Sequence, residues 1–200
     1  MLLLRRLSRL MLPVMGALAL SACGINSVPT AEENAKAKWA DVQAQYQRRA
    51  NLTGNLVATV KAAGKQEQAT LTAVTEARAK ATSIQINATD LSDPAKVAQY
   101  QAAQAQLSQG LGRLLASVEA YPDLKTNENF LQLQSQLEGT ENRIAVSIRD
   151  YNEAVQAYNT RIRTFPDAIG AKLIHGAKPM APFQAVTPGA EEAPKVDFGN

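Results

Sequence analysis

The chain has 200 residues, with 21 Lys and Arg against 18 Asp and Glu, one cysteine and one histidine. Three of the basic residues, Arg5, Arg6 and Arg9, lie in a segment that we expect to be removed, so the mature chain carries 18 basic and 18 acidic residues. Without net positive charge, the counterion release that drives general nucleic-acid binding is weak, and we expect no nucleic-acid partner. A single cysteine excludes an internal disulfide, so packing must stabilise the fold.

The N-terminus has the order of a bacterial secretion signal. Basic residues precede an apolar stretch over residues 10–20, which at about 1.5 Å per residue covers only half of a bilayer core. Leu20-Ser21-Ala22-Cys23 follows and resembles the lipobox, in which the cysteine thiol receives a diacylglycerol before the signal is cut. We therefore predict a cleaved signal peptide over residues 1–22, lipidation of Cys23, and an anchor and spacer over residues 23–29.

The first predicted helix opens at Thr30, an N-cap with Glu33 three residues later in the capping-box position. Glycine costs about 1 kcal/mol relative to alanine inside a helix, so we expect a corner at Thr53-Gly54, with helical sequence continuing to about Asn87. An unbroken first helix is the alternative. Apolar residues recur at the helical spacing of three and four along this stretch: Trp39, Val42, Tyr46, Leu56, Val60, Ala63, Leu71 and Val74.

Two further helices follow a turn over residues 87–93. Asp93-Pro94 predicts a helix start, with proline at the first helical position, and Tyr121-Pro122 ends that helix. The last long helix begins near Asn127 and stops at Pro166. Their stripes are Val97, Tyr100, Gln104, Leu107, Leu111, Leu114, Val118 and Tyr121, then Phe130, Leu133, Leu137, Ile144, Ile148, Tyr151, Val155, Tyr158, Ile162 and Phe165.

No segment shows the alternation of a β-strand, so we predict an all-α protein. Its architecture is a long antiparallel up-and-down bundle of four helices over residues 30–166. Residues 167–200 are expected to form a short helix, residues 167–175, and then a flexible proline-rich tail, whose composition buries too little apolar surface to become ordered.

Several stretches of the chain resemble the LemA family of bacterial envelope-associated proteins. They are residues 48–61, residues 74–81, above all residues 120–166, and Ala193-Pro194-Lys195-Val196-Asp197-Phe198. The resemblance covers nearly the whole mature chain and implies a helical bundle attached to the envelope, without an established activity. Family members usually read Leu-Ile-Pro-Asn where this chain has Leu52-Thr53-Gly54-Asn55, and many keep an N-terminal membrane helix where this chain has the lipobox.

The residues offer little material for catalysis or for binding a metal. His175 is the sole histidine and has no second histidine or free cysteine with which to form a zinc site. The serines have no histidine base for a Ser-His-Asp triad. The acidic residues of the last long helix have basic neighbours and are expected to be solvated or paired. We therefore expect no catalytic activity, no metal and no cofactor.

Polar residues occupy two kinds of informative position. Four lie where the stripes predict apolar side chains: Arg49, Glu67, Arg78 and Glu141. Polar residues in a seam often fix the register of helices, and a ligand or partner site is the alternative. Separately, the segment 49–55 and the turn 121–129 are expected at the same end of the bundle in either topology. We predict a partner-binding end there, with helix capping as the alternative: Arg48, Arg49, Asn55, Asp123, Lys125, Asn127, Glu128 and Asn129.

These features predict a lipid-anchored, non-catalytic scaffold or adaptor for a membrane or periplasmic protein. Ala-rich and Gln-rich helix faces suit docking against helices of a partner. The alternative is a sensor that binds a solute or peptide at the polar end of the bundle. Since Gly24 rather than an aspartate follows Cys23, we expect the outer membrane as the location if the host is Gram-negative.

Overall fold

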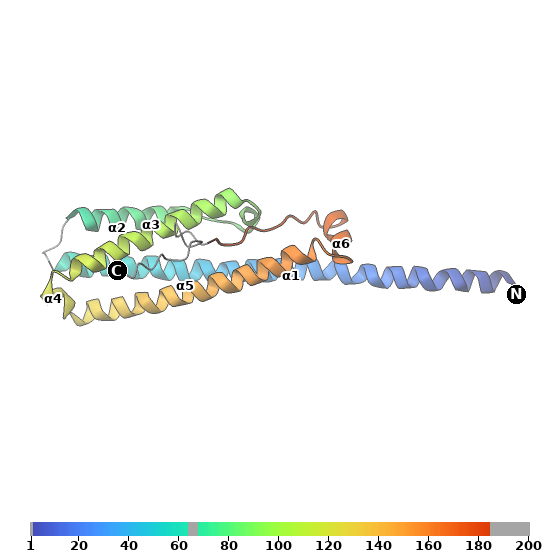
Figure 1. Cartoon of the computed structure of the whole chain (residues 1–200), viewed down its shortest axis with the longest axis horizontal. Helices are drawn as coiled ribbons and strands as arrows, with labels where there is room; N and C mark the ends of the chain where they lie inside the picture. Colours follow the sequence, from blue (N-terminus) through green and yellow to red (C-terminus); the bar gives the residue numbers. More distant parts are fainter. Residues whose placement is uncertain (1, 64–67, 185–200) are drawn as a thin grey trace, which may run out of the picture. The chain divides into compact units, whose positions relative to one another are not determined.

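A computed structural model describes residues 2–63 and 68–184 of the chain, with the backbone alone for residues 2–25. These described residues are mainly helical and contain no β-strand, which confirms the all-α class (Figure 1). The elements in chain order are α1 (Leu2–Ala62), α2 (Gln68–Ser83), the 3₁₀ helix η1 (Ala88–Ser92), α3 (Pro94–Val118), α4 (Pro122–Lys125), α5 (Glu128–Arg161) and α6 (Asp167–Leu173).

The first helix differs from the prediction at two points. It begins at Leu2 and runs through the predicted spacer, and the Thr30 hydroxyl donates to the Asn26 carbonyl at 2.7 Å inside the helix instead of capping its start. The Leu- and Ala-rich sequence before Thr30 favours helix, which explains this continuation. Cleavage of residues 1–22 stays a prediction.

The expected corner at Thr53-Gly54 is wrong, because α1 continues to Ala62. The Thr53 hydroxyl donates to the Arg49 carbonyl at 2.8 Å, a bond made within the helix. A Cβ atom at position 54 would lie 3.3 Å from Cζ of Arg78. Gly54 is therefore explained by the guanidinium that packs over it, and not by a change in chain direction.

The later boundaries agree better with the sequence. Pro94 is the first residue of α3, as predicted. α5 begins at Glu128, and the Asn127 side-chain oxygen accepts the Phe130 N–H at 3.1 Å, so Asn127 is the N-cap. The short helix α4 between α3 and α5 was not predicted.

The chain forms two compact units, each assembled from three stretches of sequence. Unit 1 comprises Met1–Gln45, Ala88–Pro94 and Arg143–Pro182, and unit 2 comprises Tyr46–Asn87, Ala95–Asn142 and Phe183–Asn200. Both α1 and α5 therefore contribute residues to each unit.

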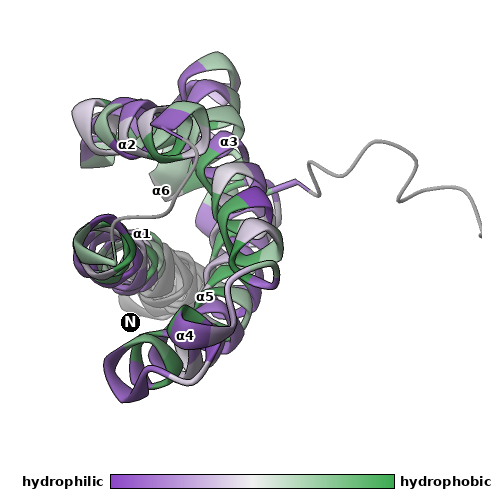
Figure 2. Cartoon of the chain, turned by 90° about the vertical axis from the view of Figure 1, so that its left-hand side faces the viewer, coloured by the Kyte–Doolittle hydropathy of each residue, from purple (hydrophilic) through white to green (hydrophobic). Residues whose placement is uncertain are grey.

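Unit 2 contains the predicted packing of four long helices. Its core is a cluster of buried apolar side chains from the expected stripes of α1, α2, α3 and α5, to which α4 adds Leu124: Leu56, Val60, Leu71, Val74, Leu107, Leu114, Phe130 and Leu137. Figure 2 views the helices end-on from the side of α4 and shows hydrophobic and hydrophilic residues on each helix, as expected for amphipathic helices.

Unit 1 contains an aromatic contact between its two long helices. The rings of Trp39 on α1 and Tyr151 on α5 lie with centroids 5.3 Å apart, and Tyr158 is also buried. Phe165, the last member of the predicted stripe, is instead 75% exposed. The reason is that α5 ends at Arg161, so Phe165 no longer follows the phase of that helix.

The segment after α6 corrects the prediction of a flexible tail. α6 itself matches the short helix that the sequence predicts. Residues 176–182, which we call the C-terminal strap, are packed against unit 1 with Met180 and Ala181 buried. Residues 185–200 lie outside the described residues.

Candidate functional site

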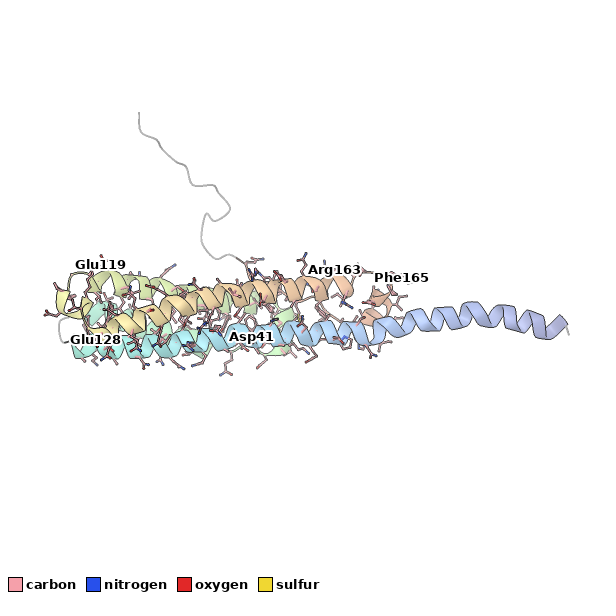
Figure 3. The ribbon with its side chains drawn as sticks, turned by 90° about the horizontal axis from the view of Figure 1, so that it is seen from below. Asp41, Glu119, Glu128, Arg163 and Phe165 are labelled. Carbon is pink, nitrogen blue, oxygen red and sulfur yellow. The ribbon has the colours of Figure 1, made fainter. Side chains whose placement is uncertain are left out.

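Five of the eight predicted partner-binding residues lie in one turn, residues 121–129, which we call the α4 turn. Asp123, Lys125, Glu128 and Asn129 are exposed there, and Asn127 is the cap of α5. Two buried side chains hold the turn in place: Leu124 within it and Phe130 directly after it, each only 3% exposed. Figure 3 shows Glu128 at this turn, with Glu119 directly after the end of α3.

The other three predicted residues lie on α1, and the structure does not bring all of them to the α4 turn. Arg48 and Asn55 are exposed. Leu56, which follows Asn55, belongs to the same core cluster as Leu124 and Phe130. This part of α1 therefore packs into the core that also holds the α4 turn.

Arg49 is the exception, because it is buried and contacts Glu141. Glu141 follows Asn129 by twelve residues of α5, which is about 18 Å along a helix. Since α1 does not turn at Gly54, Arg49 lies well before the end of the helix. Its predicted place at the polar end is therefore wrong, while partner binding by the other residues stays a prediction.

The buried guanidinium of Arg49 links three helices directly. Its Nη2 donates to the carbonyl and to the side-chain oxygen of Gln104 on α3, at 3.1 and 2.7 Å. Its Nη1 donates to the Ser108 hydroxyl at 2.7 Å and lies 3.2 Å from a carboxylate oxygen of Glu141 on α5. Gln104 in turn donates to the Ala81 carbonyl of α2 at 3.2 Å. These residues form what we call the Arg49 network, which fixes the register of four helices.

A second arginine of unit 2 also has a packing role. The Nε of Arg78 donates to the Ala50 carbonyl at 2.7 Å, and its guanidinium lies over Gly54. Arg49, Arg78 and Glu141 thus fit the interpretation that polar seam residues set helix register. Glu67 lies outside the described residues.

Aromatic rings surround the Arg49 network. The Arg49 guanidinium carbon lies 4.8 Å from the centre of the Tyr46 ring, and the Tyr46 and Tyr100 rings meet edge to face at 5.7 Å. Burial raises the pKa of Tyr46 to about 12 and also raises the pKa of Tyr100. Both phenols are therefore neutral at physiological pH and do not supply a phenolate base. The Tyr46 ring stabilises the guanidinium through its face.

In unit 1 the C-terminal strap is held through its main chain. Asn159 accepts the Met180 N–H at 2.9 Å and donates to the carbonyl of the same residue at 2.8 Å. The Tyr151 hydroxyl donates to the Ala181 carbonyl at 2.9 Å, and the Tyr158 hydroxyl donates to the Lys178 carbonyl at 3.1 Å. The Ala181 N–H reaches the Leu91 carbonyl of η1 at 2.8 Å. Three side chains of α5 and the backbone carbonyls of Leu91 and Ala171 therefore order the strap.

A cavity of about 410 Å³ lies in unit 1, between α1, η1, α5 and the start of the strap. Its wall includes the imidazole of His175 and side chains of both charges: Glu32, Lys36, Asp93 and Lys178. Glu32 and Glu33 contact the Lys36 ammonium at 2.8 and 2.7 Å, and these bonds raise its pKa. A cavity of this size with mixed charge suits a small polar solute.

The sequence interpretation missed both the strap contacts and this cavity. A usable signal was present, because Tyr151 and Tyr158 are seven residues apart on one helical face, and each phenol needs a hydrogen-bond partner when buried. The cavity gave no such signal, since its charged residues come from stretches far apart in sequence.

Within residues 2–63 and 68–184, no helix combines the length and the apolar character needed to cross a membrane. In the same described part of the chain, no three side chains of His, Cys, Asp or Glu are grouped so that they could hold a metal ion.

Comparison with known proteins gives the family. The sequence pattern of the LemA family matches residues 38–198. Protein LemA of Metamycoplasma hominis is 30% identical over 99 residues, which cover 50% of this chain and 41% of that protein. Magnetosome proteins MamQ 1 and MamQ 2 of Paramagnetospirillum magneticum are each 39% identical over 56 residues, or 28% of this chain and 21% of each relative. This chain thus spans less than half the length of the curated relatives it matches. Because the family match extends over most of the chain, the protein belongs to the LemA family, a membrane-associated family of the bacterial envelope.

Proposed function

We propose that this protein is a lipid-anchored, non-catalytic scaffold of the envelope, and that the α4 turn is the surface on which it binds a membrane or periplasmic protein. The observation that carries the proposal is the rigid display of polar side chains at this turn. Leu124 and Phe130 fix the backbone in the core, while Lys125, Glu128 and Asn129 remain exposed. A surface ordered before binding loses little conformational freedom when a partner docks.

Helix capping accounts for only part of the polar character of the α4 turn. Asn127 caps α5, and the N–H groups of Lys125 and Thr126 return to the carbonyls of Tyr121 and Pro122. Side chains of both charges extend beyond these caps. Charges of both signs favour one partner and one orientation over others more than they raise the affinity.

The Arg49 network supports this surface without forming part of it. By joining α1, α2, α3 and α5 it keeps the helices in one register. The Ala- and Gln-rich helix faces are the competing docking surface.

Photo-crosslinking in the intact envelope tests the docking surface. A double variant that exchanges charges, Lys125→Glu with Glu128→Lys, should reduce the yield of captured partner by about tenfold, as expected for a loss of about 1.4 kcal/mol. Gln106→Glu with Gln132→Lys is the matched control, because both residues are exposed on helix faces. An unchanged yield for the first pair together with a loss for the control would assign docking to the helix faces.

The lipid anchor needs its own test. Cys23→Ser should abolish incorporation of a fatty-acid analogue and prevent normal cleavage of the signal, because only the thiol can accept the diacylglycerol. Metabolic labelling measures the first effect and the mass of the N-terminal peptide measures the second. Undiminished label on the variant would contradict the anchor.

The cavity in unit 1 supports a second candidate function, the binding of a small polar solute. Its charged walls fit zwitterions, and the strap that closes one side would report an occupant. A panel of free amino acids and dipeptides should then raise the melting temperature of the protein, and Lys178→Ala should weaken the effect. No shift across the panel would leave the scaffold role as the better proposal.

A further inference from the structure

The outward face of α6 is unlike any other part of the described surface. Among the side chains that the structure describes, residues 26–63 and 68–184, six large hydrophobic ones are exposed, and four of them belong to α6 or adjoin it. Phe165 is 75% exposed, Ile169 54%, Leu173 78% and Ile174 60%. The remaining two, Leu131 and Val146, occur singly on α5. Single exposed apolar residues are ordinary, whereas a contiguous group marks an interaction surface.

Two of these side chains lie on one side of α6, since Ile169 and Leu173 are spaced by four residues of that helix. Phe165 precedes the helix by two residues, and Ile174 follows it directly. The buried residues of α6 are the small ones, Gly170 and Ala171. A helix that packs only into its own bundle shows the reverse order, with large apolar residues inward. We call the group Phe165, Ile169, Leu173 and Ile174 the α6 face.

The α6 face is held in place on both sides. The Ala168 N–H returns to Thr164 at 2.9 Å, and Arg161 lies 3.6 Å from the carboxylate of Asp167. After the helix, the Ala177 N–H reaches the Ala171 carbonyl at 2.9 Å. Gly176 between them has φ of 55°, a left-handed conformation that glycine adopts without strain. The apolar residues are therefore presented by an ordered element.

The charge around the α6 face selects among possible occupants. From Arg161 to Ile174 the chain carries three basic residues, Arg161, Arg163 and Lys172, and one acidic residue, Asp167. The Asp167 side chain is only 15% exposed and pairs with Arg161. An apolar stripe bordered by basic side chains is the pattern of helices that lie in the interface of an anionic bilayer.

The position of α6 in unit 1 also favours a membrane as the partner of the α6 face. In Figures 1 and 3, α6 lies beside α1, and the earlier part of α1 continues past it toward the N-terminus. Figure 3 shows Phe165 here, just beyond Arg163. Among the α1 side chains that the structure describes, which begin at residue 26, Val28 is the first buried one. It lies five residues after Cys23, or about 8 Å along a helix. A lipid on Cys23 would keep the bilayer surface within a few turns of this end of unit 1.

From these observations we infer that the α6 face docks on the surface of an anionic membrane, with the rings and aliphatic side chains of Phe165, Ile169, Leu173 and Ile174 inserted below the headgroups. The contact goes beyond the scaffold role and does not depend on the α4 turn. It gives the protein a second attachment besides the lipid and thereby fixes how unit 1 is oriented on the membrane.

Depth-dependent fluorescence quenching tests the inference on the full lipoprotein reconstituted in vesicles. Trp39 is the only natural tryptophan, is 3% exposed, and provides a constant background. Ile169→Trp adds a reporter to the α6 face, and Val146→Trp is the matched control at another exposed apolar position of unit 1. In vesicles of phosphatidylglycerol and phosphatidylcholine with brominated acyl chains, the reporter at 169 should be quenched at least about twofold more than the control, because interfacial helices sit about 5–10 Å into the boundary.

A second variant separates charge from apolar contact. Adding Lys172→Glu to the Ile169→Trp variant should weaken quenching in phosphatidylglycerol vesicles. For Ile169→Trp alone, purely zwitterionic vesicles should likewise give weaker quenching than phosphatidylglycerol vesicles. Flotation of the vesicles measures the lipid anchor independently. Protein that floats but shows equal quenching at 169 and 146 overturns membrane docking and leaves the anchor standing. A blue-shifted reporter at 169 that is insensitive to bromine also overturns it, because the face is then covered by protein.

Discussion

Unit 1 and unit 2 share two helices, yet their interiors are closed by different means. Unit 2 joins its helices through an apolar core and through the buried guanidinium of Arg49. Unit 1 instead holds an extended strap by hydrogen bonds to the main chain of that strap. The difference lies in the side chains of α5, which offers Phe130 and Leu137 to one unit and Tyr151 and Tyr158 to the other. A helix therefore sets the spacing of contacts, while its residues decide what can pack against it.

The two interiors should fail in different ways. Removing apolar side chains from the core of unit 2 lowers the free energy of unfolding in two ways. The transfer free energy of the removed atoms is lost, and a cavity or a buried polar group is left behind, so the whole cluster is destabilised. Removing a hydrogen bond to the strap frees a short surface segment, so the loss should remain local. The following substitutions test that contrast, from the largest expected effect to the smallest.

Leu111→Asp should have the largest effect, because it buries an unpaired carboxylate in the core of unit 2. Leu111 is 6% exposed. We expect a loss of about 4 kcal/mol in the free energy of unfolding, enough to unfold a marginal protein. Circular dichroism during urea denaturation measures it, with Gln132→Asp at an exposed position as the control. Ile148→Asp, at a half-buried position, should cost less. Equal stability for Leu111→Asp and the control would show that the assigned phase of α3 is wrong.

Arg49→Ala should rank next. It leaves the Gln104 carbonyl and side chain without their donor in a buried place and should cost about 2–4 kcal/mol. Glu141→Ala should cost only about 1 kcal/mol, because that side chain is 46% exposed and its charge is largely solvated. Chemical denaturation of both variants gives the two values. A larger loss for Glu141→Ala than for Arg49→Ala would mean that the ion pair, and not the contacts to α3, holds the Arg49 network together.

Arg49 was expected at the polar end because Gly54 was expected to form a corner of the chain. The sequence identified Arg49 as a polar residue in an apolar seam. It also predicted correctly that the last long helix begins near Asn127 and that α3 begins at Pro94, because these are local patterns. It misjudged Gly54, since the reason for that glycine is Arg78, which comes from a different helix. A partner 24 positions away in the chain cannot be inferred from local propensity.

Asn159→Ala should release the strap while the rest of unit 1 persists. It removes both hydrogen bonds to the Met180 main chain and should cost about 1–2 kcal/mol locally. Hydrogen exchange at the Met180 amide should accelerate. Gln156→Ala on the same helix removes an exposed amide and is the control. Should exchange at Met180 stay as slow as in the control, the tyrosine contacts alone would suffice to hold the strap.

The strap also shows why composition misled the prediction of a flexible tail. Too little apolar area was available in residues 167–200 to order the segment, and that estimate ignored order gained from polar pairing. Tyr151, Tyr158 and Asn159 were interpreted only as parts of an apolar stripe and its flank. Their hydrogen-bonding groups are what bind the strap.

The smallest effect is expected at two glycines of unit 2. Gly112 on α3 has open space where a Cβ would lie, so Gly112→Ala should stabilise the protein by about 0.5–1 kcal/mol through helix propensity alone. Gly54→Ala should gain almost nothing, because the new methyl group meets the Arg78 guanidinium at 3.3 Å. Thermal denaturation distinguishes the two. Equal stabilisation would show that Arg78 moves aside without cost.

Over residues 179–182 of the strap, no backbone N–H group is left without a hydrogen-bond acceptor. Pro179 and Pro182 have no N–H group, and the N–H groups of Met180 and Ala181 between them are taken by Asn159 and Leu91. An extended segment with free N–H groups can recruit another strand and begin aggregation. This strap cannot act as such a template. The protein can thus carry an extended stretch of chain at its surface without pairing through it with other molecules, even where many copies lie close together in the envelope.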